Sequence, residues 1–562
     1  MSARRHLLVL LPIVLIAALF RAWLIASDGV SFDSDEAIVG LMARHINQGH
    51  AIPTFYYGQT YMGSLDAILV AGGFRLLGES VHAIRIVQMV VYLLSVASGY
   101  GLAVTLTRNR RIAAMTGLLL AIPTPLGALY TTLTLGGYNE LVLFGTITLW
   151  LGWIVTEGGQ ADGVQHLWRW AALGLAAGLG WWTNGAIVSA IAVVGLMGLR
   201  RFALHRWHVY ALAGVCFLVG SAPWWVYNVH HDWAALQFLT TGFEAAPGTE
   251  SISPIDTLLG LLILGLPAVY GLRYTWEAAF ITTPGALLVL GLYLLLVAVL
   301  ITEWLAAHRA RGRKLPPPSI TTYPAVSRWL WLVFGVFALI FVFSSFSDAT
   351  GRYLMPLWVP AALGVAMSLD RLRRAGRIVP TLALGLLLVF QAGAVIRAAQ
   401  TDIGLQPQLL VKLQTPAAHD DRVLDFLEER GYKHGYSSYW ASFRLIFRSG
   451  ESVMLDTSLP YIKGGYHPNH NRYPPYADVV ASAERVVWIS HNYAALDAVI
   501  AERLKAAAIT YQTIDLGDYR VYYDFSTRVA PADLGLDSEQ PLDELPPFDP
   551  ASLDLENQAS GS

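Results

Sequence analysis

Three carboxylates stand within four residues near the start of the chain: Asp33, Asp35 and Glu36, in the stretch SFDSDEA. They lie in the first polar stretch after an apolar opening segment, and a loop rich in glycine and tyrosine follows. A carboxylate partly removed from water has a raised pKa and can act as a general base near neutral pH, although a helix N-terminus opposes that rise. We therefore consider one of these acids as a base and another as a ligand for a donor, an acceptor or a metal ion.

Helix capping is the alternative explanation for the same acids. Ser34 or Asp33 can accept hydrogen bonds from the free N–H groups of a following helix, where acidic side chains are favourable. Residues 37–46 have apolar side chains at helical spacing, which predicts an amphipathic helix along a membrane surface. Capping accounts for one or two acids and leaves the third open. Because Glu36 follows Asp35 directly, their side chains point about 100° apart on a helix, which predicts one base and one supporting acid.

The composition predicts a membrane scaffold around these polar residues. The chain has 562 residues, of which 55% are hydrophobic and 14% are charged. Soluble domains carry about 25% charged residues. The net charge of −2 does not suggest a nucleic-acid partner. The single cysteine excludes an intramolecular disulfide, so a domain outside the membrane depends on its core alone.

Apolar runs of about 18–22 residues predict a polytopic α-helical protein. Placing the arginine and lysine clusters in the cytoplasm gives about eleven spans, a cytoplasmic N-terminus and an extracytoplasmic C-terminus. The run 258–272 is shorter and contains Pro267, and we interpret it as re-entrant or interfacial. The loops 28–81, 130–138, 229–256 and 346–352 then lie outside. The expected spans are 6–27, 82–106, 112–130, 139–156, 169–183, 186–200, 208–228, 280–301, 329–346, 353–370 and 378–397.

A soluble segment follows the last expected span. We expect a transmembrane domain over 1–400 that includes the first outer loop 28–81, a small extracytoplasmic α/β domain over 401–528, and an acidic, disordered tail over 529–562. The elements expected in the α/β domain are helices over 422–430 and 494–508, a strand over 485–490, and a hairpin over 511–525 around Gly517 and Asp518.

Several short motifs follow one another in order across residues 1–370. They are Asp35-Glu36, GQTYMGSLDA at 58–67, GGYNE at 136–140, PWWVYN at 223–228 and GRYLMPL at 351–357. Together they resemble the GT-C class of integral-membrane glycosyltransferases, and within it the branch of protein O-mannosyltransferases and bacterial lipid A aminoarabinose transferases. Those O-mannosyltransferases have a His-Pro-Pro run where this chain has Thr60-Tyr61-Met62, so the similarity is to a bacterial member of the broader group and not to a protein O-mannosyltransferase.

The resemblance implies an inverting hexosyl- or pentosyltransferase at the outer face of the plasma (inner) membrane. Its donor would be a polyprenyl-phosphate sugar, and its acceptor hydroxyl would belong to a lipid, a glycan or a protein. A phosphate leaving group needs no general acid. One carboxylate must deprotonate the acceptor hydroxyl, and cations must stabilise the departing phosphate. We expect Asp35 to be the base, Glu36 to support it and Asp33 to be the reserve candidate. Arg352 is the expected phosphate ligand, with a snorkelling membrane anchor as the alternative.

The remaining candidates line the outer loops. The resemblance leaves a divalent metal open, because some relatives use one and others do not, and no ligand spacing here demands it. His467, His470 and Asn471 are interpreted as loop residues. Aromatic anchoring at the membrane interface is the alternative for the tyrosines, and capping is the alternative for Glu140. The expected donor- or acceptor-binding residues are Tyr57, Gln59, Tyr61, Asp66, Tyr138, Asn139, Glu140, Arg352 and Tyr353.

Two other functions compete with sugar transfer. A transporter or lipid flippase places charged residues near the bilayer midplane, whereas the spans expected here are nearly free of internal charge. A non-catalytic membrane scaffold with an external binding domain fits the hydropathy pattern, but it does not explain the acidic loop.

Overall fold

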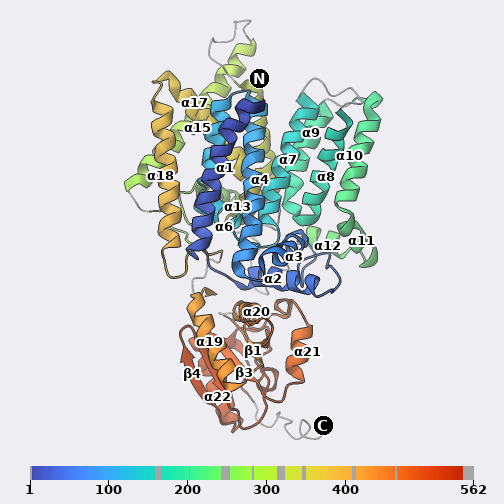
Figure 1. Ribbon diagram of the computed structural model, residues 1–562, viewed down its shortest axis with the longest axis vertical. Helices are drawn as coiled ribbons and strands as arrows, with labels where there is room; N and C mark the ends of the chain where they lie inside the picture. The colour runs from blue at the N-terminus through green and yellow to red at the C-terminus, as the bar shows by residue number, and fades with distance from the viewer. Residues whose placement is uncertain are drawn as a thin grey trace. The chain divides into compact units, whose positions relative to one another are not determined.

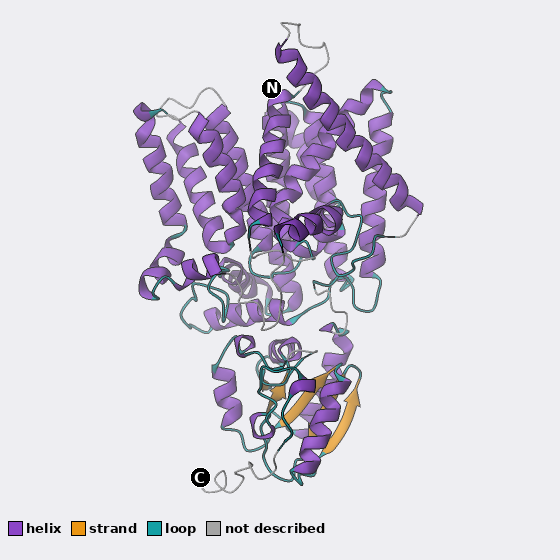
Figure 2. Ribbon diagram, turned by 180° about the vertical axis from the view of Figure 1, so that it is seen from behind, coloured by secondary structure: helices purple, strands orange, loops and turns teal. Residues whose placement is uncertain are grey.

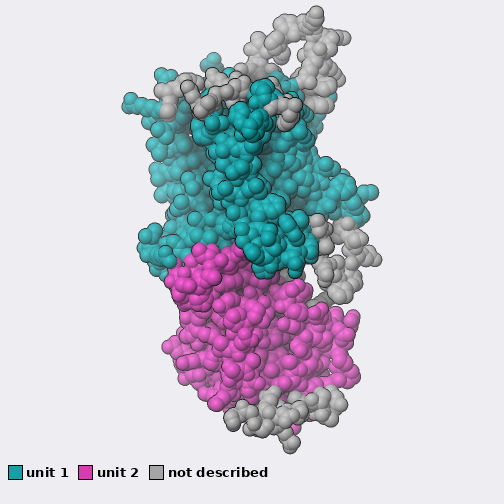
Figure 3. Space-filling view, turned by 90° about the vertical axis from the view of Figure 1, so that its right-hand side faces the viewer, with its two compact units in different colours: residues 1–30, 60–409 teal, residues 31–59, 410–562 magenta. Residues whose placement is uncertain are grey.

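The computed structural model describes residues 3–157, 166–200, 203–241, 253–281, 284–312, 323–344, 350–407, 413–461 and 465–548. The chain divides into two compact units (Figure 3). Unit 1 comprises residues 1–30 and 60–409, and unit 2 comprises residues 31–59 and 410–562. The division differs from the expected domain boundaries, because the acidic first half of the outer loop belongs to the same unit as the C-terminal residues.

Unit 1 is helical, and its long helices run side by side (Figure 1). Residues 352–357 form a short 3₁₀ segment before α17. The helices are α1 (Ala3–Ala26), α3 (Leu65–Leu77), α4 (Val81–Thr107), α5 (Arg110–Ala121), α6 (Pro125–Tyr130), α7 (Tyr138–Glu157), α8 (Leu167–Thr183), α9 (Val188–Arg200), α10 (Trp207–Gly220), α11 (Ala222–His230), α12 (Ala234–Thr241), α13 (Pro254–Gly260), α14 (Leu266–Val269), α15 (Pro284–Gly312), α16 (Pro324–Val342), α17 (Trp358–Arg371) and α18 (Val379–Ala399).

In the part of the chain that the structure describes, seven helices are long and apolar enough to cross a membrane. The pair α10 and α11 adds an eighth if its 66° bend is counted within one span. The expected number of about eleven spans stays a prediction. One of the expected spans contains most of α5, which has only 12 residues and rises about 18 Å, less than the hydrocarbon core of about 30 Å. The run 258–272 is not among the candidate spans; it forms α13, a π-helical turn and α14.

Two glycines set the close packing of α8 on α10. Gly174 and Gly178 are four residues apart and therefore lie on one face of α8. A Cβ atom at Gly174 would lie 2.0 Å from the Ala213 carbonyl oxygen, and one at Gly178 would lie 2.2 Å from the Phe217 carbonyl oxygen. Small residues at this spacing let two helix backbones approach in a membrane, where apolar burial gives no net drive for helix association.

Unit 2 contains a five-stranded mixed sheet covered by helices (Figure 2). The strand order is β2-β1-β3-β5-β4; β1 pairs in parallel with β2 and β3, whereas β5 pairs antiparallel with β3 and β4. The strands are β1 (His434–Ser437), β2 (Met454–Asp456), β3 (Val487–His491), β4 (Gln512–Leu516) and β5 (Tyr519–Tyr523). The helices are α2 (Ser34–Asn47), α19 (Ala417–Arg430), α20 (Tyr439–Arg448), α21 (Pro475–Ala481) and α22 (Ala494–Ala506).

The elements expected in the C-terminal domain are confirmed as α19, β3, α22 and the β4–β5 hairpin. The sequence did not predict β1, β2, α20 or α21. The expected disordered tail is wrong for residues 529–548, because Val529, Leu534 and Leu536 are fully buried in the core around Trp488. These apolar residues are interspersed among the acidic ones, so the acidic composition masked them. Residues 549–562 lie outside the described residues.

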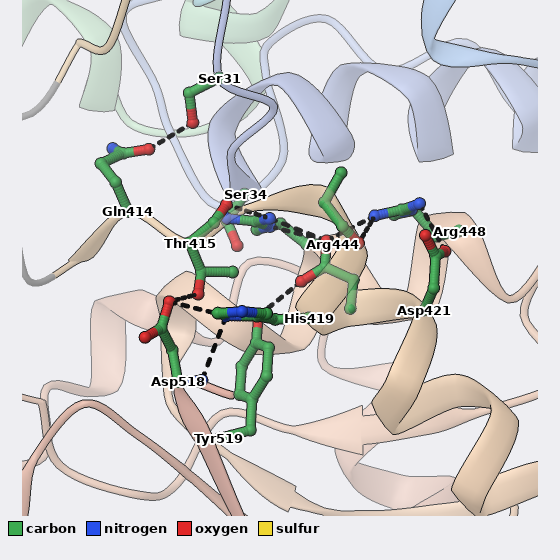
Figure 4. Close-up of polar contacts among 12 residues, drawn as sticks. Ser31, Ser34, Gln414, Thr415, His419, Asp421, Arg444, Arg448, Asp518 and Tyr519 are labelled. Atoms are coloured by element: carbon green, nitrogen blue, oxygen red, sulfur yellow. Dashed lines mark hydrogen bonds and ion pairs between the residues drawn. The ribbon is translucent and has the colours of Figure 1, made fainter. Parts of the chain in front are cut away.

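A buried ion pair joins α19 to α20 (Figure 4). Arg444 Nη2 lies 2.8 Å from Asp420 Oδ2, and both side chains are at most 1% exposed. Arg448 Nη1 lies 2.9 Å from the same oxygen, and the Tyr519 hydroxyl donates to Asp420 Oδ1 at 2.7 Å. The carboxylate is therefore fully hydrogen-bonded, which is what allows it to be buried as a charge.

Replacing Arg444 with alanine should destabilise unit 2 by about 3 kcal/mol, because removing one partner of a buried pair leaves the other poorly compensated. The exposed pair of Arg520 with Asp515 offers a control, and Arg520→Ala should cost less than about 1 kcal/mol. Hydrogen exchange of the β3 and β5 amides in the full-length protein measures both free energies. Equal losses in the two variants would contradict the buried-pair account.

Candidate active site

Asp33 is the N-cap of α2, as the capping explanation expects for one of the acids. Its side chain accepts from the Glu36 backbone N–H at 2.9 Å, and it is 1% exposed. Burial raises its pKa well above the ordinary value, and the neighbouring Asp35 adds to the rise. The Ser34 hydroxyl donates to the Tyr439 carbonyl at 2.7 Å, which ties the first turn of α2 to α20. Asp33 therefore builds the helix terminus.

The body of α2 differs from the amphipathic surface helix expected over 37–46. Its residues from Glu36 to His45 are all buried, and the helix packs against α20 within unit 2. Glu36 itself is fully buried. The supporting acid is therefore part of an interior helix.

Asp35 is the half-buried member of the acidic trio. Its Oδ1 accepts a short hydrogen bond from the Tyr439 hydroxyl, and the Tyr56 hydroxyl lies 3.5 Å from the same oxygen and 3.2 Å from the Asp35 carbonyl oxygen. Burial raises the pKa of both phenols well above the ordinary value, and the charge at Asp35 adds to the rise, so both remain neutral donors. Among the described residues none donates to Oδ2.

A cation and a neutral imidazole surround this carboxylate. Arg472 donates to the Gly58 carbonyl at 3.1 Å, and its guanidinium lies 5.5 Å from the centroid of the Tyr439 ring. We assign the Gln59 amide with its oxygen towards Arg472, where it accepts from Nη2 at 2.7 Å. The His470 ring lies 4.9 Å from the Tyr439 ring, and burial lowers the pKa of His470 to about 3. His470 is therefore uncharged at neutral pH.

Tyr57 belongs to a second polar network in unit 2. Its hydroxyl lies 2.9 Å from His45 Nδ1, and His45 Nε2 lies 3.1 Å from Glu451 Oε1. The Tyr476 hydroxyl donates to the same carboxylate oxygen at 2.8 Å, and Arg44 lies 3.3 Å from its other oxygen. Burial opposes ionisation of Glu451, but the hydrogen bonds from His45 and Tyr476 lower its pKa to about 2.

Three predicted tyrosines of unit 1 share one cavity of about 270 Å³. Tyr61, Tyr138 and Tyr353 line it together with apolar side chains that include Trp181 and Phe337. The Tyr61 ring also stacks on Phe238, with 4.7 Å between centroids. The lining is apolar with a few polar groups, which is the usual character of a small-molecule or lipid-chain pocket.

Arg352 lies beside this cavity. It begins the 3₁₀ segment, and its guanidinium lies 5.1 Å from the centroid of the Tyr353 ring. The cation is thus next to an aromatic wall of the cavity, and a cation over a ring face is favourable.

The other predicted residues of unit 1 form an interior hydrogen-bond network. Gln88 donates to Glu140 at 2.9 Å and accepts from Asn139 at 2.7 Å through its side-chain oxygen. Asp66 accepts from the Thr134 hydroxyl at 2.9 Å, and burial raises the pKa of Asp66 to about 6. Asp66 and Glu140 are each 1% exposed. We expect these residues and the acids of α2 to belong to one active site. Because they lie in different units, this stays a prediction.

The described residues do not gather a set of metal ligands. No group of three or more His, Cys, Asp or Glu side chains within them is arranged to hold a metal ion. Asp33 is committed to the helix terminus. The divalent metal that the resemblance leaves open therefore stays a prediction, and we derive no step through one.

Sequence reasoning missed three residues around Asp35: Tyr56, Tyr439 and Arg472. Tyr56 directly precedes the predicted residue Tyr57, whereas Tyr439 and Arg472 lie more than 400 positions from Asp35 in the chain. A signal for Arg472 existed, because the stretch YHPNHNRYPPY at 466–476 concentrates cationic and aromatic residues outside the expected spans. No local pattern marked Tyr439.

Comparison with known proteins adds the fold relationship. No protein-family model matches the sequence, and no curated protein matches it. Among solved structures, ArnT from Cupriavidus metallidurans bound to undecaprenyl phosphate is similar, with 13% identity, 93% of this chain and 98% of that chain covered, and a TM-score of 0.60. Its apo state gives 15% identity, 91% and 97% coverage, and a TM-score of 0.60. The chain has the GT-C fold.

A third similar structure is the archaeal oligosaccharyltransferase AglB from Archaeoglobus fulgidus, in complex with an inhibitory peptide and a dolichol-phosphate. It shows 14% identity, covers 94% of this chain and 75% of that chain, and has a TM-score of 0.51. The GT-C resemblance stated from the motifs is thereby confirmed at the level of the fold. The apolar helices and this fold make the chain a multi-pass membrane protein.

The low pKa of Glu451 predicts how stability depends on pH. A carboxylate whose pKa falls from the ordinary 4.5 to about 2 stabilises the folded state fully above the ordinary value, and this contribution disappears as the pH falls towards 2. Glu451→Gln should therefore be less stable than the wild type at pH 7, and the gap should narrow between about pH 5 and pH 3.

Thermal unfolding of the full-length protein at several pH values measures this gap. The exposed Glu502 on α22 offers a matched control, and Glu502→Gln should stay close to the wild type throughout. A gap for Glu451→Gln that does not change with pH would contradict the prediction.

Proposed function

We propose that this protein is an inverting glycosyltransferase that moves a sugar from a polyprenyl-phosphate donor to an acceptor hydroxyl, with Asp35 as the general base. The observation that carries the proposal is the Asp35 carboxylate, which has one oxygen held by tyrosine hydroxyls and the other available, in a chain with the GT-C fold. The similar ArnT structure contains undecaprenyl phosphate, which supports a lipid-linked donor.

The reaction needs one proton acceptor and one anion site. Asp35 Oδ2 takes the proton of the acceptor hydroxyl as its oxygen attacks the anomeric carbon, and the bond from that carbon to the phosphate oxygen breaks with inversion. The electron pair leaves with the polyprenyl phosphate, which is a weak base and needs no protonation. Arg352 of unit 1 stays the predicted ligand of the departing phosphate, since a guanidinium offers two parallel donors to phosphate oxygens.

The cavity of unit 1 suits the first part of the lipid chain. Its apolar lining accepts hydrocarbon, and Arg352 beside Tyr353 puts a cation next to it, so a phosphate and an attached lipid can be held together. Tyr61 and Tyr138 line the same cavity, so we expect them to contact the sugar-phosphate end of a donor. Transporters place unpaired charge in such a cavity, and none of its described lining residues is ionised at neutral pH.

Other residues support the site through structure. Tyr57 and Gln59 hold the loop after α2 through His45 and Arg472, while Asp66, Asn139 and Glu140 brace the helices near Tyr138. We place the reaction at the outer face of the plasma (inner) membrane, with the N-terminus cytoplasmic, a hexose or pentose as the sugar, and a lipid, glycan or protein as the acceptor.

Replacing Asp35 with asparagine should reduce turnover by at least about 100-fold, because the amide cannot accept the acceptor proton. The assay is transfer from a panel of polyprenyl-phosphate hexoses and pentoses by the purified full-length protein. The exposed Asp425 on α19 offers the matched control, and Asp425→Asn should retain wild-type turnover. Full activity in Asp35→Asn would remove Asp35 as the base.

Filling the cavity should weaken donor binding. Ser189 lines the cavity, and Ser189→Phe should raise the KM for the lipid donor by about tenfold, since the ring occupies space needed by the lipid chain. Leu196 lies on the same helix, is 41% exposed and does not line the cavity, so Leu196→Phe is the control. An unchanged donor KM in Ser189→Phe would place the lipid elsewhere.

A further inference from the structure

We propose that Tyr439 and Arg472, from the C-terminal segment of unit 2, are positioning residues for Asp35: Tyr439 orients its carboxylate and Arg472 supplies a nearby positive charge, so that Oδ2 is left for the acceptor proton. The proposal rests on the proposed function of Asp35 as a base. It assigns to the C-terminal segment a direct part in sugar transfer, beyond a contact with the acceptor.

The hydrogen bonds around Asp35 are asymmetric. The hydroxyls of Tyr439 and Tyr56 both donate to Asp35 Oδ1, and no described residue donates to Oδ2. A carboxylate fixed through one oxygen presents the other in a constant direction, which is what proton removal from a bound hydroxyl requires. Tyr439 is held for this task, because it is 2% exposed and its backbone carbonyl accepts from Ser34 in the first turn of α2.

Arg472 supplies the charge. Its guanidinium is positioned by the Gly58 carbonyl and the Gln59 amide, which belong to the loop that follows α2, and it covers the Tyr439 ring. Its Nε is buried and has no hydrogen-bond partner among the described residues. Within the described residues Arg472 makes no ion pair with a carboxylate, and its positive charge interacts with Asp35 electrostatically without a direct hydrogen bond.

A purely structural role explains this arrangement less well. The buried Arg444 of unit 2 is paired directly with a carboxylate, that of Asp420. Arg472 and Tyr439 instead converge on the one half-exposed acid of the trio. The ionisable groups around the Asp35 carboxylate are Tyr56, Tyr439, Tyr461 and Arg472 from other segments, and Asp33 at its own helix terminus.

The test is the pH dependence of kcat/KM in full-length Tyr439→Phe, Arg472→Gln and Arg472→Lys. The donor is the polyprenyl-phosphate sugar that the wild type turns over fastest in the panel above. Loss of a hydrogen bond or a positive charge makes the carboxylate harder to ionise, so the acid limb should move to higher pH by about one unit in Tyr439→Phe and in Arg472→Gln. Arg472→Lys keeps the charge and should stay near the wild type.

The matched control is Tyr432→Phe. The Tyr432 hydroxyl donates to Asp524 at 2.6 Å in the same unit, so the control removes the same kind of hydrogen bond at a site that does not face Asp35. Its acid limb should not move. If Tyr439→Phe and Arg472→Gln lower kcat/KM without moving the limb, their role is structural and the proposal is overturned.

A measurement without substrate separates this proposal from the proposed function. Carbodiimide labelling of Asp35 at a series of pH values, read by mass spectrometry and normalised to the exposed Asp425, reports protonation of the base directly. A labelling curve that moves to higher pH in Tyr439→Phe supports the positioning role, even if the wild type transfers no sugar from any donor, a result that would overturn only the proposed function. Curves that coincide with the wild type overturn the positioning role.

Discussion

The hydrogen bond from the Tyr439 hydroxyl to Asp35 joins side chains that are 404 positions apart in the chain. It depends on α2 and α20 packing together, because each helix supplies one end of the bond in its first turn. A second hydrogen bond, from the Ser34 hydroxyl to the Tyr439 backbone carbonyl, also joins α2 to α20. The acidic stretch therefore acquires the Tyr439 hydrogen bond as part of unit 2.

Arg444 and Glu451 in unit 2 and Arg21 in unit 1 are buried or half-buried ionisable groups with different kinds of partner. In unit 2, Arg444 pairs with Asp420, and Glu451 accepts from His45 and Tyr476, so the charges are compensated. In unit 1, Arg21 on α1 is fully buried and is hydrogen-bonded to the Ala128 carbonyl and the hydroxyls of Thr131 and Thr132, with the Tyr92 ring 4.1 Å away. The Arg21 guanidinium donates to neutral oxygens and faces an aromatic ring, and these contacts reduce the free-energy cost of burying its charge in apolar surroundings.

Different parts of the candidate site were visible in the sequence to different degrees. The acids of α2 stood out because three carboxylates in four residues are unusual beside a membrane span, and both the capping role of Asp33 and the half-exposed position of Asp35 agree with the alternatives that their spacing left open. The tyrosines 61, 138 and 353 were selected one by one from separate loops, and their common cavity was not predictable from spacing. Arg472 and Tyr439 were missed because nothing local relates them to the acids.

The sequence by itself determined the class of the protein. Long apolar runs require helices in a bilayer, because backbone groups must find their hydrogen bonds within the segment, and the order of short motifs matched the GT-C fold that the structure has. The sequence also determined α19, α22 and the β4–β5 hairpin, whose signals are local periodicity and a turn at Gly517. Tertiary structure alone decided that residues 31–59 join the C-terminal unit and that Tyr439 meets Asp35. Packing of helices distant in sequence sets those contacts, and such packing depends on shape and burial across the whole unit, for which no short stretch of sequence carries a pattern.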